Sequence, residues 1–114
     1  MKTEIRDTDR KNLKVVDIEG EVDVYTSMEL EKELNTLIDE GNKFLLINLE
    51  KVTYMDSSGL GILVAILKRL KREDGMLKIE KLTPSIRKIF ELTRLTKFFE
   101  IYDNEKEALQ NFKA

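Results

Sequence analysis

The chain carries two adjacent serines, Ser57 and Ser58, behind an aspartate and ahead of a glycine in the segment Asp56-Ser57-Ser58-Gly59. A serine hydroxyl can accept a phosphoryl group, or it can act as a nucleophile when a neighbouring base removes its proton. The usual base is histidine, which the chain lacks, and the segment does not have the Gly-x-Ser-x-Gly turn of serine hydrolases. Phosphorylation is therefore a chemistry that these residues leave open, and we expect no enzyme and no catalytic residue.

Composition excludes several other kinds of site. With neither cysteine nor histidine, the chain has no disulfide framework and lacks the commonest metal ligands, so we expect no metal and no other cofactor. Its 20 basic and 22 acidic residues give a net charge of −2, without the basic field that drives nucleic-acid binding. We expect no direct contact with DNA or RNA.

The length of 114 residues, 41% of them apolar, suits a single domain over residues 1–114. The longest uncharged apolar run, residues 57–67, is far shorter than the roughly 20 residues of a membrane-spanning helix. The amino terminus shows no signal-peptide pattern. We therefore expect a cytoplasmic protein without membrane contact.

Hydrophobic patterning predicts the strands that must position the serines. Short alternating segments predict strands at residues 3–8 and 13–19, joined by a polar turn into a hairpin. The nearly continuous apolar run at 44–49 is typical of a central strand that is covered on both faces. Residues 76–82 alternate apolar with charged side chains, which indicates another strand, and 98–102 suggests a short last one.

A period of 3.6 residues predicts the helices between these strands. The first covers about 27–40, with Thr26 as its N-cap and Gly41 as the left-handed residue after its end. Further helices are predicted at about 58–73 and 84–92. The apolar stripes of the first two helices, which we expect in the core, are Met28, Leu30, Leu34, Leu37 and Ile38, then Leu60, Leu63, Val64, Leu67 and Leu70.

A last helix is indicated by Asn104 and Glu107, which resemble a capping box ahead of Ala108, Leu109 and Phe112. The order ββαβαβαβα predicts an α/β fold, a mixed four- to five-stranded sheet with an N-terminal hairpin, parallel central strands and about four helices. Right-handed crossovers place the carboxyl ends of the parallel strands along one edge of the sheet, where sites gather. The loops 20–25, 50–58 and 83–84 should meet there.

The middle of these loops turns into the second helix at Ser57, so the free N–H groups of the helix start point at its hydroxyl. A phosphate adds about −1.5 to −2 charges, which a helix amino terminus tolerates, so the fold should survive while the surface changes. With Glu21, Asp23 and Asp56, the phosphate would form an anionic patch. Aspartate and serine before a helix are also ordinary N-caps, and Ser58 lies as close to the helix start as Ser57.

The segment Met55 to Gly61, preceded by Asn48-Leu49 and Val52, closely resembles the signature of STAS-domain anti-sigma factor antagonists. Three further segments agree in order and spacing, so that the resemblance covers nearly the whole chain and implies the STAS fold: Gly20-Glu21-Val22-Asp23 with Thr26, Pro84 to Leu92, and Glu105 to Leu109. One departure lies after the third helix, where the family often has glycine and this chain has Arg94 in that region. Arg94 must then take the left-handed conformation, or the helix must end differently.

The resemblance implies a partner and a switch. The unmodified antagonist would bind an anti-sigma factor that is a serine kinase and so release the sigma factor. The kinase would phosphorylate Ser57, the first serine after the aspartate, which weakens binding, and a PP2C-type phosphatase would restore the binding form. The partner-binding residues that the resemblance implies are Asp23, Thr26, Asp56, Ser57, Ser58 and Gly59.

Other uses of the fold stay open. A STAS domain can also serve as a scaffold, as part of a transporter assembly, or as a nucleotide-sensing module. A receiver-like phosphoacceptor domain is a more distant alternative, because Asp56 follows a central apolar strand. A receiver needs an acidic pair before its first helix, however, and here Asp7 and Asp9 precede a second strand.

Overall fold

The computed structural model describes residues 1–112, so Lys113 and Ala114 of the predicted domain range lie outside the described residues. The strands are β1 (Lys2–Asp7), β2 (Leu13–Val22), β3 (Phe44–Met55), β4 (Met76–Glu80) and β5 (Glu100–Tyr102). The helices are α1 (Thr26–Asp39), α2 (Ser57–Arg72), α3 (Pro84–Leu92) and α4 (Glu105–Gln110), with a 3₁₀ turn η1 (Leu95–Lys97) before β5. The predicted order ββαβαβαβα is confirmed.

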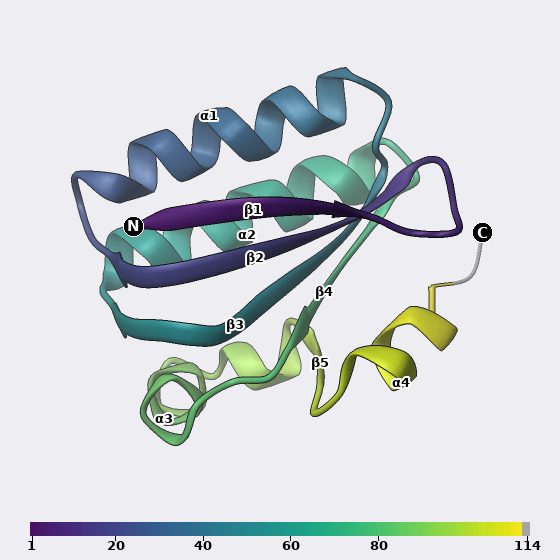
Figure 1. Ribbon diagram of the computed structural model, residues 1–114. Helices are drawn as coiled ribbons and strands as arrows, with labels where there is room; N and C mark the ends of the chain where they lie inside the picture. The colour runs from purple at the N-terminus through teal and green to yellow at the C-terminus, as the bar shows by residue number, and fades with distance from the viewer. Residues whose placement is uncertain (113–114) are drawn as a thin grey trace.

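The five strands form one sheet in the order β1-β2-β3-β4-β5 (Figure 1). β1 pairs antiparallel with β2, which gives the predicted hairpin, and all later neighbours pair in parallel. Each parallel strand is next to its predecessor, so right-handed crossovers carry α1, α2 and α3 over the same face. The carboxyl ends of β2, β3 and β4 consequently share one edge of the sheet.

The two faces of the sheet have separate cores. The larger core lies under α1, α2 and α3, where Leu34 and Phe90 are fully buried and Val64 packs partly buried against the cluster. The smaller core lies on the other face, which we call the outer face, under α4; its buried members are Leu13, Val15, Phe44, Leu46, Ala108 and Phe112. Lys78 and Glu80 are buried as well, so the apolar and charged alternation of β4 marks two covered faces.

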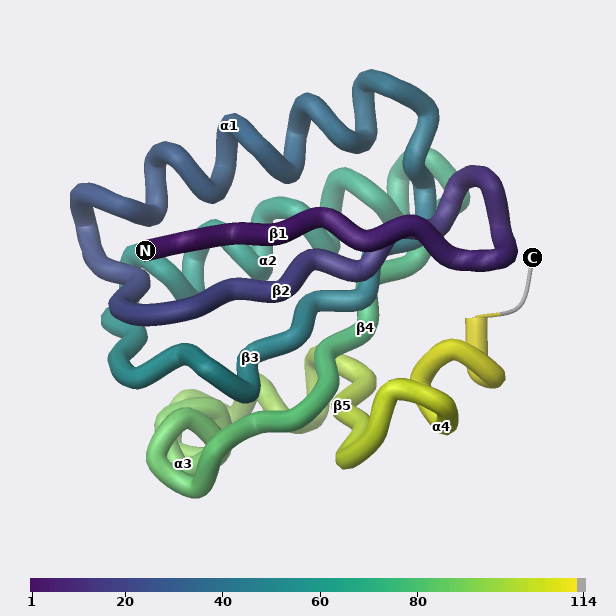
Figure 2. The backbone as a smooth tube through the Cα atoms, in the orientation of Figure 1, coloured from purple at the N-terminus to yellow at the C-terminus, as the bar shows by residue number. Residues whose placement is uncertain are grey.

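β2 and β3 are longer than their sequence patterns predicted. They run on to Val22 and Met55, three and six residues beyond the predicted ends at 19 and 49, and they pair with each other there. Figure 1 and Figure 2 show these extensions of β2 and β3 side by side. Val22, Val52 and Met55 are buried, which explains why the charged stretch between them still forms a strand. The predicted loops 20–25 and 50–58 are accordingly shorter.

The first turn of α1 corrects two predictions. Thr26 is the first helical residue rather than the N-cap; the cap position belongs to Tyr25, whose side chain makes no capping hydrogen bond. Met28 was expected in the core but is 68% exposed. The core-facing position of that turn is taken by Ser27, because three residues separate it from Leu30 on the buried stripe.

Helix ends follow the remaining predictions closely. Gly41 has the expected positive φ of 102° after α1. Arg94 takes the left-handed conformation after α3, with φ of 63°, so the missing family glycine is replaced by a strained residue. Thr83 caps α3, and Asn104 caps α4 by accepting a 2.8 Å hydrogen bond from the backbone N–H of Glu107.

Candidate functional site

Two aspartates stand side by side at the carboxyl edge of the sheet. Val22 and Met55 are register partners in the parallel pair β2–β3, and Asp23 and Asp56 are the next residues along each strand. The backbone N–H of Asp56 donates to the carbonyl of Val22 at 3.2 Å, which fixes the two strand ends together. The structure therefore brings together Asp23 and Asp56, two members of the predicted anionic patch.

Asp56 is the N-cap of α2, a role that the sequence left open between the aspartate and the serine that follows it. Its Oδ1 accepts hydrogen bonds from the backbone N–H of Ser58 at 2.9 Å and of Gly59 at 3.2 Å. A carboxylate in this place satisfies two of the free N–H groups of the helix and also interacts favourably with the positive end of the helix dipole. The cap holds the start of α2, and with it Ser57, in one position.

The side chain of Asp23 binds backbone N–H groups at the start of α1, a role that the sequence did not predict. Its Oδ1 accepts from the backbone N–H of Tyr25 at 2.9 Å and of Thr26 at 3.0 Å, and these bonds lower the pKa of the Asp23 carboxyl. Thr26 completes the turn: its hydroxyl accepts from the backbone N–H of Asp23 at 2.9 Å and can donate to the Glu21 carbonyl at 3.0 Å. Thr26 is thus a residue that shapes this loop.

Ser57 and Ser58 differ in their surroundings, although the sequence could not separate them. Ser57 is the first residue of α2 and is exposed, whereas Ser58 is half-buried and has its backbone N–H bound to Asp56. Among residues 1–112, neither hydroxyl forms a hydrogen bond with another protein group; the bonds at this turn come from the backbone N–H groups. The Ser57 hydroxyl is therefore the more accessible of the two.

Gly59 lies beneath this surface and is buried. A Cβ at Gly59 would stand 2.8 Å from side-chain atoms of both Met55 and Val22, and 3.2 Å from the Val22 carbonyl. The absence of a side chain lets α2 approach the ends of β2 and β3 closely. Gly59 thus positions the serines rather than offering its own surface to a partner.

Four exposed apolar side chains lie within five residues of one of the aspartates along the chain, and we call them the apolar rim: Val24, Tyr25, Met28 and Tyr54. Tyr25 is 80% exposed and directly follows the loop at Asp23. Tyr54 precedes the end of β3 and pairs in register with Glu21. Exposed aromatic and methionine side chains grouped beside polar residues are typical of protein-binding surfaces. The sequence carries one signal for this rim, which is an aromatic residue inside a predicted loop, but hydrophobic patterning did not predict the rim.

The third loop predicted at this edge stays separate from the aspartates. Thr83 caps its own helix, and no hydrogen bond or ion pair in the described part of the chain joins Thr83-Pro84 to Asp23 or Asp56. The prediction that three loops meet is thus supported for the first two only. Around the serines the charge is negative, since Glu21 is exposed next to the two half-buried aspartates.

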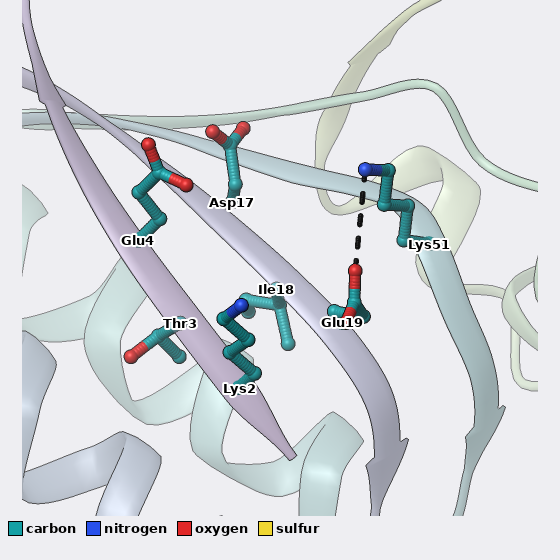
Figure 3. A pocket seen from close by; sticks show the side chains of 7 residues that line it. All are labelled: Lys2, Thr3, Glu4, Asp17, Ile18, Glu19 and Lys51. Carbon is teal, nitrogen blue, oxygen red and sulfur yellow. Dashed lines mark ion pairs between the residues drawn. The ribbon is translucent and has the colours of Figure 1, made fainter.

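A hollow of the surface lies elsewhere, over β1, β2 and β3 on the outer face (Figure 3). It is a shallow cavity of about 160 Å³ lined mainly by charged side chains, with Lys51 reaching toward Glu19 at 4.0 Å. Small-molecule sites are usually larger and mostly apolar. Ser57 does not line this cavity and is exposed at the start of α2, which suits a protein partner.

The family model for the STAS domain matches residues 4–108. The anti-sigma-B factor antagonist of Staphylococcus aureus strain NCTC 8325 is 40% identical over 95 residues, which cover 83% of this chain and 88% of that protein. The chain belongs to the anti-sigma factor antagonists of the STAS family. Its segment Asp56-Ser57-Ser58-Gly59 and the turn at Asp23 lie within the matched residues.

Solved structures agree with the STAS fold. An anti-sigma factor antagonist from Mycobacterium paratuberculosis superposes with a TM-score of 0.87 at 29% identity, covering 99% of this chain and 94% of that one. The Bacillus cell fate determinant SpoIIAA in its phosphorylated form superposes with a TM-score of 0.75 at 23% identity, covering 96% and 97%. The resemblance drawn from the sequence is confirmed.

Membership of this family makes the protein a regulator of sigma factors rather than an enzyme. The rival interpretation of Asp56 as a receiver phosphoacceptor is not supported, because its carboxylate is engaged as a helix cap. None of the helices in residues 1–112 is long and apolar enough to cross a membrane. Within the same residues, no group of three or more acidic side chains is placed to hold a metal ion.

Proposed function

We propose that this STAS domain is a phosphorylation-controlled antagonist of an anti-sigma factor, and that it acts as one domain over residues 1–114 in the cytoplasm. Unmodified, it binds an anti-sigma factor that is a serine kinase and so frees the sigma factor. Phosphorylation of Ser57 weakens that binding, and a PP2C-type phosphatase reverses it. The observation that carries the proposal is the exposed Ser57 hydroxyl at the start of α2, a helix start that Asp56 caps and that lies near the residues of the apolar rim.

The site offers both attraction and a means to cancel it. The apolar rim supplies side chains such as Tyr25 and Met28 that lose water when a partner covers them. A phosphate on Ser57 would place about −1.5 to −2 charges beside Asp23, Asp56 and Glu21. In a packed interface these charges repel acidic groups and lose hydration, and every 1.4 kcal/mol or so of lost binding energy is a tenfold loss of affinity.

The helix start explains why the modification leaves the fold intact. A phosphate at the amino terminus of α2 interacts favourably with the positive end of the helix dipole. The phosphorylated SpoIIAA protein keeps the same fold as this chain, with a TM-score of 0.75. The switch would therefore act through surface charge rather than through rearrangement.

A kinase assay tests this function. The chain is incubated with ATP and the anti-sigma factor kinases of its organism, and the phosphate is mapped by mass spectrometry, with Ser57→Ala and Ser58→Ala as matched variants. We expect phosphate on Ser57, none on Ser57→Ala, and retained phosphorylation of Ser58→Ala. Phosphate on Ser58, or no phosphate with any of the kinases, would contradict the proposal.

Binding supplies the second measurement. Calorimetric titration of the kinase with unmodified, phosphorylated and Ser57→Asp protein should show the unmodified form binding at least tenfold more tightly than the phosphorylated form. Circular dichroism of the three forms should coincide, because the phosphate lies outside the core. Equal affinities for the unmodified and phosphorylated forms would rule out the switch even if Ser57 is the phosphoacceptor.

A further inference from the structure

Glu80, the last residue of β4, is a carboxyl group in a place where a charge is costly. Its side chain is 0% exposed on the outer face of the sheet. Neither of its two oxygens has a hydrogen-bond partner in the described part of the chain. An ionised carboxylate that is buried without a partner loses far more free energy than the fold of a small domain can spare.

Polar groups from six elements face Glu80, and the cations and the amide among them have other partners. They are Arg6 of β1, Asp17 of β2, Asn48 of β3, Lys78 of β4, Lys81 directly after β4, Tyr102 of β5 and Glu105 of α4. Asn48 is the register partner of Glu80, but its amide donates to Asp17 at 2.8 Å. Lys78 forms an ion pair with Glu100 at 2.8 Å.

The remaining cations do not neutralise Glu80 either. Arg6 divides its guanidinium between Asp17 and Glu105, with contacts of 2.6 Å to each. Lys81 approaches Glu50 at 4.0 Å. The carboxylate of Glu105, in the first turn of α4, is thus the group next to Glu80 that can accept a hydrogen bond from a protonated Glu80.

We propose that Glu80 carries a proton in the folded protein, that this proton is shared with Glu105 across the β4–α4 contact, and that its loss in mildly alkaline solution releases α4 from the sheet. The Glu80 hydroxyl donates to the Glu105 carboxylate, so two acidic side chains attract each other as long as one is neutral. Without the proton, two carboxylates face each other in a buried place and repel.

Burial, followed by the contact with Glu105, raises the pKa of Glu80 to about 8. The ordinary value of a glutamate, which applies in the unfolded chain, is 4.5. At pH values between these two, Glu80 keeps its proton while α4 is docked on the sheet and loses it when α4 is released. Docking of α4 therefore weakens as the pH rises. The transition is completed when the pH passes the pKa of the folded state.

Release of α4 would uncover the smaller core. Ala108 and Phe112, which follow Glu105, cover the apolar side chains of β2 and β3 on the outer face. α4 contributes only six residues. Besides this core and the Glu80–Glu105 contact, it is held by the ion pair of Arg6 with Glu105 and by the hydrogen bond that Arg10 donates to the Phe112 carbonyl at 2.8 Å. The device lies on the outer face and does not involve the apolar rim or Ser57.

Nuclear magnetic resonance of the full chain tests the proposal. The carboxyl carbon of Glu80 and the exchange protection of the α4 amides are followed from pH 4 to 10, in the wild type and in Glu80→Gln. We expect the Glu80 carbon to titrate near pH 8 and protection in α4 to fall at least tenfold over the same range. In Glu80→Gln, protection in α4 should not depend on pH.

Two further variants separate this contact from general effects of charge. Glu4→Gln removes an exposed carboxylate on the outer face near Asp17 and should leave the α4 transition unchanged (Figure 3). Glu105→Gln removes the accepting carboxylate and should lower the titration midpoint of Glu80. Titration of wild-type Glu80 near 4.5, or an α4 transition that persists in Glu80→Gln, would overturn the proposal; the wild-type titration decides it even if a variant fails to fold.

Discussion

At the scale of single residues, Asp23 and Asp56 have equivalent places, each one residue past a strand and each accepting two backbone N–H groups at a helix start. The sequence indicated a cap at Asp56 or Ser57 without choosing between them, because aspartate and serine are both common at this position. It missed Asp23, since Thr26 is an equally good capping residue three positions on. The choice between them depends on how far β2 continues, which is a tertiary effect.

Gly59 and Gly61 allow a matched test of close packing at this site. Both lie in α2, where alanine is favoured over glycine by up to about 1 kcal/mol. A Cβ at Gly59 would stand 2.8 Å from Met55 and Val22, whereas nothing lies within 4 Å of one at Gly61. We expect Gly59→Ala to lower the free energy of unfolding by about 1–3 kcal/mol, and Gly61→Ala to raise it slightly, as measured by urea unfolding. Equal effects of the two substitutions would show that the approach of α2 to the strands is not tight.

At the scale of elements, the order and type of every strand and helix followed from periodicity, but the extensions of β2 and β3 did not. The charged stretch between Asn48 and Met55 has the pattern of a loop because its buried residues, Val52 and Met55, are too sparse to alternate regularly. Pairing with β2 supplies the missing stabilisation. These extensions carry Asp23 and Asp56 out beyond β4, whose pairing with β3 ends at Asn48 and Glu80.

The position of the apolar rim on these elements leads to a binding prediction. Tyr25 is 80% exposed, so Tyr25→Ala should leave the urea midpoint nearly unchanged and weaken binding to the anti-sigma factor kinase at least tenfold, which is about 1.4 kcal/mol. Leu92→Ala is the matched control, because Leu92 is 75% exposed at the carboxyl end of α3. Calorimetric titration provides the affinities. If both variants lose affinity equally, or neither does, the rim is not the binding surface.

At the scale of the whole molecule, the sequence predicted one face of the sheet better than the other. The stripes of α1 and α2 identify the larger core directly, apart from Met28. The outer face carries a mixture of apolar and charged residues, and nothing in the pattern of β4 indicated that Lys78 and Glu80 are buried. Their burial depends on where the six-residue α4 docks, and short helices of this kind are defined by tertiary contacts.

Charges spread over the molecule predict a maximum of stability on the acidic side of neutrality. Asp17 and Glu105 have lowered pKa values because Arg6 binds them, and Lys43 with Arg69 lowers the pKa of Glu73 to about 2. Their stabilising contributions are complete above the pKa of the unfolded chain and are lost as the pH falls. The contribution of Glu80 has the opposite sign and is lost as the pH rises toward its value of about 8.

We therefore expect the urea midpoint of unfolding to be highest near about pH 5 and to fall on both sides. Measurements at pH 3, 5, 7 and 9 check the shape of the curve. The alkaline decline should disappear in Glu80→Gln, while the acidic decline should remain. A wild-type midpoint that stays constant between pH 5 and 9 would contradict this expectation.

The two outer strands of the sheet have a consequence for how the protein behaves at high concentration. An unpaired strand edge can recruit the strand of another molecule and so start aggregation. Here one edge is β1, on which charged Lys2, Glu4 and Arg6 alternate, and the other is β5, which is only three residues long. The strongly apolar part of β3, residues 44–48, lies between β2 and β4, while its continuation to Met55 has only β2 as a neighbour. Pairing of β1 or β5 with a strand of another molecule is thereby disfavoured. The surface around Ser57 can then bind other proteins without aggregation through these two edge strands.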